Sequence, residues 1–206
     1  MANQLVKRYD RVMLTSRGEA TQERILDAAL AEFADRGFAG ARVDRIAAAA
    51  GCNKNLIYVH FGSKEALFTT VIERNTARIV EALSLTPDDL ADYAARAFDY
   101  ALANPASMRL VAWFALEPEL PNPPSRAEAV AEQKRLIGEA QERGTVTSAF
   151  PPGFLMTAIM VLAAGWSAGS PFGPALDPDG TKDQQRLREM IAAAIARLST
   201  PAPDET

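Results

Sequence analysis

Residues 43–63 read VDRIAAAAGCNKNLIYVHFGS, and this stretch decides how the N-terminal part of the chain folds. Its first half carries apolar residues at the spacing of one helical face, namely Val43, Ile46, Ala47 and Ala50. Gly51 can end that helix, and Asn53 can cap a second short helix over 54–61. Two short helices joined by a glycine-containing turn are typical of a helix-turn-helix, whose second helix enters the major groove of DNA.

Helical periodicity continues on both sides of this stretch and predicts an all-α fold. No run of alternating apolar and polar residues indicates a strand, and glycine or proline separates the periodic segments. We expect about nine helices, which cover 21–36, 43–50, 54–61, 63–83, a segment from Pro87, a segment from Pro105, 125–143, 153–169 and 181–198. Residues 1–65 then form a helix-turn-helix domain with a flexible basic arm over 1–18, and residues 66–206 form a second helical domain.

The composition narrows the class of protein. One cysteine and one histidine exclude an internal disulfide, a cysteine-rich zinc module and most histidine-based metal sites. The chain has neither a signal-peptide core nor an apolar run of about 18 residues, so we expect a cytoplasmic protein outside the membrane. Residues 1–80 carry 12 basic and 9 acidic side chains, whereas the remainder carries 10 and 17. This asymmetry is compatible with a polyanionic partner. The basic residues Lys7, Arg8, Arg11 and Arg17 leave two alternatives open: a disordered tail, or an arm that adds phosphate or minor-groove contacts.

The helix over 54–61 has an outward face suited to nucleic acid. At about 100° per residue, Asn55 and Val59 point furthest outward when Ile57 faces the core. The flanks of this face carry Lys54, Leu56, Tyr58 and His60. An amide, a cation, a phenol, an imidazole and small apolar groups together can contact base edges, thymine methyl groups and phosphates.

Residues 21–67 resemble the DNA-binding domain of the TetR family of bacterial transcriptional regulators. The resemblance rests on a long motif without gaps: Ile25-Leu26-Asp27-Ala28-Ala29, Phe33, Gly37-Phe38, Ile46-Ala47, Ala50-Gly51, Ile57-Tyr58, His60-Phe61 and Ser63-Lys64-Glu65-Ala66-Leu67. It implies that double-stranded operator DNA is the partner. It also implies that Tyr58, His60 and Lys64 contact phosphates, and that the positions meeting bases are Lys54, Asn55, Leu56 and Val59.

Three positions depart from the usual pattern of that family. Arg42 stands where the family usually caps the helix with Thr or Ser, and an arginine can reach a phosphate instead. The order Asp44-Arg45 reverses a frequent basic–acidic pair, which leaves open which of the two approaches DNA. Leu56 replaces a frequent Thr and exchanges a hydroxyl contact for an apolar one. We therefore include Arg42 and Arg45 among the expected DNA contacts.

The second domain is rich in methionine and aromatic residues, most of which we expect in the core. The resemblance implies a cavity for a small ligand, and large deformable side chains suit an apolar or aromatic one. The candidates to line it are Met108, Trp113, Phe114 and Met160. We expect no cofactor and no metal ion.

The last two long helices are the predicted dimer interface, because a single helix-turn-helix makes few contacts and two-fold operators require two. The helix over 153–169 offers Ala164, Trp166 and Ala168. The helix over 181–198 offers Leu187, Ile191, Ala194, Ile195 and Leu198. Two copies would pack these helices as a four-helix bundle.

The segment 165–169 fits the G-x-S-x-G pattern of a hydrolase nucleophile, yet a helix precedes it and His60 lies far upstream. We therefore expect close helix packing there and no enzyme. The expected function is a ligand-responsive repressor that binds a palindromic operator as a dimer. Two alternatives stay open: a helical small-molecule-binding protein without operator binding, and an activator of the same family.

Overall fold

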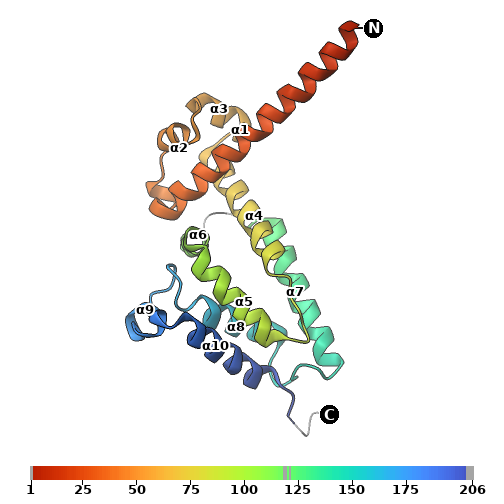
Figure 1. Ribbon diagram of the computed structural model, residues 1–206, viewed down its shortest axis with the longest axis vertical. Coiled ribbons are helices and arrows are strands. Elements are labelled where there is room, and N and C mark those ends of the chain that lie inside the picture. Colours follow the sequence, from red (N-terminus) through yellow and green to blue (C-terminus); the bar gives the residue numbers. More distant parts are fainter. Residues whose placement is uncertain (1, 118–119, 121, 203–206) are drawn as a thin grey trace. The chain divides into compact units, whose positions relative to one another are not determined.

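The computed structural model describes the backbone of residues 2–117, 120 and 122–202, with their side chains from Gly18 onward. The chain divides into two compact units, Met1–Val71 and Ile72–Thr206. The division falls inside α4 (Lys64–Ala82), beyond the expected boundary at residue 65. Every regular element in the described part is a helix, which confirms the all-α prediction (Figure 1).

The first unit contains α1 (Ala2–Gly40), α2 (Val43–Ala50), α3 (Lys54–Phe61) and the first turns of α4. The helices α1 and α3 each pack against α2, and the buried side chains of the unit form a small core. The fully buried large side chains of this core are Ile25, Phe33, Ile46, Ile57, Leu67 and Phe68. The rings of Phe33 and Phe68 meet edge to face with centroids 4.8 Å apart, an arrangement that aromatic pairs favour.

The first helix begins at Ala2, well before its expected start at Thr21. No proline interrupts this segment, and the Thr21 hydroxyl accepts a hydrogen bond from Arg24 Nη2 at 3.2 Å instead of capping a helix. The backbone leaves the helical conformation at Gly37 (φ 66°), where the first helix was expected to end. The basic side chains expected in the arm, Lys7, Arg8, Arg11 and Arg17, lie outside the described side chains.

The turn between α2 and α3 forms as its local sequence predicts. Gly51 adopts the left-handed conformation at φ 62°, which glycine reaches without steric cost, and ends α2. The Asn53 side chain caps α3 by accepting a hydrogen bond from the Asn55 N–H at 2.9 Å. Gly62, at φ 78°, ends α3 before α4 begins.

The second unit begins with the rest of α4, from Ile72 onward. It continues with α5 (Leu90–Ala103), α6 (Pro105–Ala115), α7 (Pro124–Glu142), α8 (Pro152–Ala164), α9 (Gly173–Leu176), the 3-10 turn η1 (Gly180–Lys182) and α10 (Gln184–Ser199). The helices α5, α8 and α10 pack against one another and enclose most of its core. The buried residues at the centre of this core include Tyr93, Phe98, Leu155, Ile159, Leu187, Ile191 and Ile195.

The segment after α8 differs most from expectation. The eighth helix ends at Ala164 instead of residue 169, and the following turn folds back so that the Gly173 N–H donates to the Gly165 carbonyl oxygen at 3.0 Å. A Cβ on Gly173 would collide with that oxygen and with the Trp166 ring. The segment 170–180, which lies between the two expected helices 153–169 and 181–198, contains α9 and begins η1.

Candidate nucleic-acid interface and ligand pocket

The outward face of α3 carries the side chains that the periodicity placed there. Ile57 is buried, whereas Asn55, Tyr58, Val59 and His60 are exposed. Val59 has 78% of its surface exposed, so its methyl groups are available for contact with thymine methyl groups. Leu56 is only half-buried and lies at the edge of this face.

Arg45 is held by the body of the first unit. Its Nε donates to Glu32 Oε1 at 2.7 Å, its Nη2 lies 2.5 Å from the same oxygen, and Nη2 also donates to the Gly40 carbonyl oxygen at 2.8 Å. Two of the three guanidinium nitrogens of Arg45, Nε and Nη2, therefore have partners within the first unit, and the expectation that Arg45 contacts DNA stays a prediction.

Glu32 joins α1 to the start of α2. Besides Arg45, its Oε1 accepts the N–H of Arg42 at 2.9 Å, so it binds a backbone donor at the N-terminus of α2. Burial alone would raise the pKa of Glu32, but the hydrogen bonds from Arg45 and from the Arg42 N–H outweigh burial and lower that pKa. Sequence reasoning missed Glu32, because nothing local marks a partner 13 positions away.

Arg42 and Asp44 lie at the start of α2 with their side chains exposed. The Arg42 side chain makes no capping hydrogen bond, as expected for an arginine at this position. Asp44 forms an ion pair with Lys54, the first residue of α3, at 3.0 Å. The hydrogen bond that Lys54 donates to the Asp44 carboxylate raises the pKa of Lys54.

Lys64 opens α4 beside the same surface. Its Nζ lies 4.7 Å from the centroid of the Phe38 ring, so a cation–π contact positions the ammonium group. The Ser63 hydroxyl accepts the Ala66 N–H at 3.1 Å and caps the helix. An anion at this end of α4 would meet both the positive end of the helix dipole and the Lys64 cation.

An apolar pocket of about 550 Å³ lies in the second unit among α6, the C-terminal part of α8 and the segment around α9. Of the four side chains predicted to line a ligand cavity, Met108 and Met160 do so, whereas Trp113 and Phe114 do not. Phe114 is buried, and the Arg126 guanidinium lies 5.0 Å from its ring centroid. Sequence reasoning missed Phe172 and Leu176 in the pocket wall, because their segment carries no helical periodicity.

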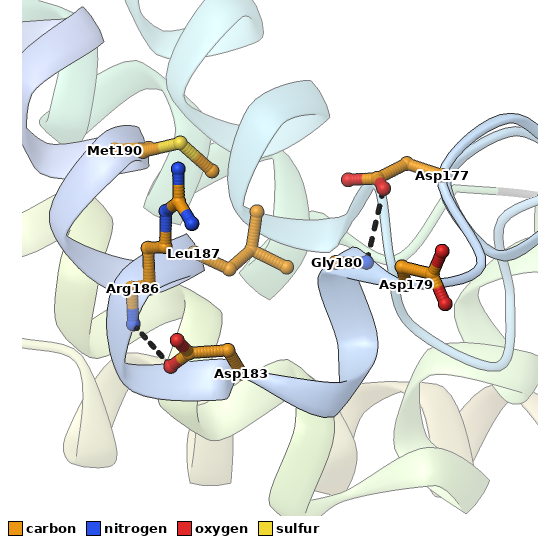
Figure 2. A pocket seen from close by; sticks show the side chains of 7 residues that line it. All are labelled: Asp177, Asp179, Gly180, Asp183, Arg186, Leu187 and Met190. Atoms are coloured by element: carbon orange, nitrogen blue, oxygen red, sulfur yellow. Dashed lines mark hydrogen bonds between the residues drawn. The ribbon is translucent and has the colours of Figure 1, made fainter.

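A second, more polar pocket of about 270 Å³ lies beside η1 and α10 (Figure 2). Two of its three carboxylates serve the backbone: Asp177 Oδ1 accepts the Gly180 N–H at 2.9 Å, and Asp183 Oδ1 accepts the Arg186 N–H at 3.0 Å. The third, Asp179, pairs with Lys182. These contacts shape the turn before α10, and no metal-binding cluster of acidic, His or Cys residues occurs among the described residues.

The residues predicted at the dimer interface separate into two groups. Leu187, Ile191 and Ile195 are buried in the core of their own chain, so these three are corrected to core positions. Ala194 and Ala168 are exposed, and the partly exposed members of the set are Ala164, Trp166 and Leu198. Trp166 and Ala168 lie beyond the end of α8, because the helix stops at Ala164.

The segment 165–169 shows the close packing that its small residues predict. A Cβ on Gly169 would lie 2.8 Å from the carbonyl oxygen of Met108, so glycine lets this turn approach α6. Ser167 is buried, and the element before it is the helix α8. No helix of the described part is long and apolar enough to span a membrane.

Two family models match the chain. The model described as bacterial regulatory proteins of the tetR family matches residues 25–71, which include α2 and α3. The model described as the tetracyclin repressor-like C-terminal domain matches residues 89–197.

Relatives and solved structures agree with these matches. The HTH-type transcriptional repressor SCO4008 of Streptomyces coelicolor is 38% identical over 184 residues, which cover 87% of this chain and 95% of that protein. The HTH-type transcriptional repressor NicS of Pseudomonas putida is 40% identical over 74 residues, 36% of this chain and 35% of that protein. The crystal structure of the putative transcriptional regulator SCO4942 from Streptomyces coelicolor superposes with a TM-score of 0.77 at 37% sequence identity. The match covers 87% of this chain and 98% of the SCO4942 chain. The chain therefore belongs to the TetR family of bacterial transcriptional regulators, which bind DNA through a helix-turn-helix.

Proposed function

We propose that this regulator represses transcription by binding a two-fold operator as a homodimer, and that a small apolar ligand releases it. The exposed face of α3 carries this proposal, because Asn55, Tyr58, Val59 and His60 all point away from the core of the first unit. The protein would act in the cytoplasm, where its DNA lies, by binding alone, without a catalytic step or a cofactor.

On the operator, we expect some side chains of this surface to contact bases and others to contact phosphates, according to their chemistry. The Asn55 amide can donate to and accept from an adenine edge, and Val59 can contact a thymine methyl group. Tyr58, His60, Lys64 and Arg42 would contact phosphates, which fix the register of the helix in the groove. Leu56, at the edge of the face, would add an apolar contact.

The dimer would form on the exposed apolar face of α8 and α10. Phe154 and Val161 lie seven positions apart on one face of α8 and are 52% and 63% exposed. Met190 and Ala194 occupy one exposed face of α10. Since α8 and α10 contact each other, two copies could join these faces in a four-helix arrangement.

The apolar pocket would receive the ligand, and α6 would connect the pocket to α4. Met108 lines the pocket, and its neighbour Ser107 donates a buried hydrogen bond to Asn75 Oδ1 of α4 at 2.8 Å. A ligand that displaces α6 therefore acts directly on the helix whose first residue is Lys64. The ligand must bind the conformation with low DNA affinity more tightly for this coupling to work.

Selection of duplexes from a random-sequence library with the purified full chain tests operator binding. We expect two inverted half-sites with centres about one DNA turn, or a multiple of it, apart. Asn55→Ala should change the selected sequence. Lys64→Ala should weaken binding to all sequences and reduce the salt slope by about one.

Lys134→Ala, which removes an exposed cation from α7, is the matched control and should bind as the wild type does. A Lys54/Asn55/Lys64 triple alanine variant that selects the same site with unchanged affinity would contradict the proposal.

A further inference from the structure

An ion pair joins Asp44, in the first turn of α2, to Lys54, the first residue of α3. Both Asp44 oxygens approach Lys54 Nζ, Oδ1 and Oδ2 each at 3.0 Å. The Asp44 side chain is 68% exposed and that of Lys54 is 44% exposed. The pair therefore stays in contact with solvent, where a DNA phosphate could compete for the lysine.

The neighbouring charges make Lys54 the cation that Asp44 holds. Arg45, next in sequence, is bound to Glu32 and to the Gly40 carbonyl oxygen and turns toward α1. Arg36 pairs with Asp35 at 2.7 Å on α1. Asp44 thus places a carboxylate beside the first residue of the helix that reads the bases, and the two charges cancel there.

We propose that Asp44 is a specificity-determining residue, which holds the Lys54 ammonium away from phosphates and releases it only to a base acceptor of the operator. This inference rests on the proposed operator binding and refines it. On arbitrary DNA the neutral pair adds no phosphate contact. On the operator, a guanine edge with two acceptors, O6 and N7, can replace the carboxylate as the partner of Lys54.

The strengths of the interactions involved are compatible with such a role. Exposed ion pairs are weak, so the operator can compete with Asp44 for the lysine. Non-specific binding depends on the number of phosphates neutralised, so one lysine withheld from the backbone changes both the affinity and its salt dependence. Asp44 therefore lowers non-specific affinity more than operator affinity.

The test compares Asp44→Asn with the wild type on two duplexes, the one selected by the wild type and a shuffled duplex of equal composition. We expect Asp44→Asn to bind the shuffled duplex about three- to tenfold more tightly, with a salt slope steeper by about one. Its affinity for the selected duplex should rise less, so the ratio of the two affinities falls. Asp35→Asn, which removes the same charge from an exposed pair on α1, is the matched control.

The Lys54→Gln background shows whether Asp44 acts through Lys54. There, Asp44→Asn should change binding to the shuffled duplex no more than Asp35→Asn does. An Asp44→Asn variant that keeps the wild-type affinity ratio, or that has equal effects with and without Lys54, would overturn the inference while leaving operator binding intact. A wild-type protein with no preference between the duplexes would contradict operator binding itself and, with it, this inference.

Discussion

At the scale of single residues, Glu32 links α1 to the start of α2 through three hydrogen-bonding groups: Arg45 Nε, Arg45 Nη2 and the Arg42 N–H. Its side chain is only 13% exposed, and its carboxylate binds the Arg45 guanidinium and the backbone N–H of Arg42. Arg42 makes no side-chain cap of its own, so Glu32 supplies the acceptor that α2 lacks at its start. Because α3 packs against α2, the proposed operator binding would depend on Glu32 as well as on the exposed residues of α3.

Replacing Glu32 with Gln should loosen α2. The charge-assisted hydrogen bonds to Arg45 become neutral, which should lower the opening free energy of the α2 amides by about 1–2 kcal/mol at pH 7. Because folding lowers the pKa of Glu32, its contribution is present above the unfolded pKa of about 4.3 and is lost as the pH falls through the folded pKa. Hydrogen exchange from pH 7 downward should show the wild type approaching the variant in acid. Glu19→Gln, in an exposed part of α1, is the control, and equal protection of α2 in all three proteins would contradict the prediction.

Residue patterns predicted α2, α3 and the turn between them because the signals there are local. Gly51, Asn53 and Gly62 act within their own turns, and Ile57 lies on a helix whose faces follow from its period. The Glu32–Arg45 and Asp44–Lys54 pairs join different helices, so only the packing of α1, α2 and α3 reveals them. The same packing gives Arg45, which we expected to contact DNA, partners inside the first unit.

At the scale of helices, α4 and α6 are joined by a polar contact within an apolar core. Asn75 and Ser107 are 3% and 6% exposed, and the Ser107 hydroxyl donates to Asn75 Oδ1. Buried polar groups are costly unless they are paired, so the contact favours one register between the two helices. Met108 follows Ser107 and lines the pocket, so we propose that α4 senses a bound ligand at this position.

Ser107→Ala should destabilise the second unit, because it leaves Asn75 Oδ1 without its donor. Loss of a partner for a buried polar atom costs about 1–3 kcal/mol, which urea unfolding of the full chain can measure. Ser125→Ala, at an exposed position near the start of α7, should change stability by less than about 0.5 kcal/mol. Equal stability of the two variants would show that the Ser107 hydrogen bond contributes nothing net.

The helices after α7 show where sequence patterns fail. Leu187, Ile191 and Ile195 form a stripe, and periodicity cannot tell whether such a stripe faces its own core or a partner. The end of α8 at Ala164 depends on tight contacts that glycines permit, such as that of Gly169 with α6, and these come from segments distant in sequence. Trp113 and Phe114 were expected in the pocket, but α6 directs Met108 and Val111 there.

At the scale of the whole molecule, two copies would place two α3 helices on one operator. Val161→Glu puts a charge in the exposed apolar face of α8 without entering the core, so the chain should stay folded but become monomeric at micromolar concentration. Val130→Glu, on the 40% exposed position of α7, is the matched control and should remain a dimer. Sedimentation with circular dichroism distinguishes loss of assembly from loss of fold, and a folded, dimeric Val161→Glu variant would exclude this face of α8.

Ligand control requires two conformations of the protein that differ both in the affinity of the pocket for the ligand and in the affinity of α3 for DNA. A compound found by thermal shift among neutral apolar molecules should weaken operator binding by about 5–150-fold at saturation, the usual range of coupling between sites. Val111→Trp would fill the pocket from α6, so this variant should lose the thermal shift and the response to the compound while it still binds the operator. Val130→Trp adds the same ring to α7 outside the pocket and should respond as the wild type does. Suppose that a compound stabilises the wild type but not Val111→Trp, and leaves operator affinity unchanged. The compound then binds in the pocket, and the proposed coupling between the pocket and α4 is refuted. A response that persists in Val111→Trp would move the controlling site elsewhere in the chain.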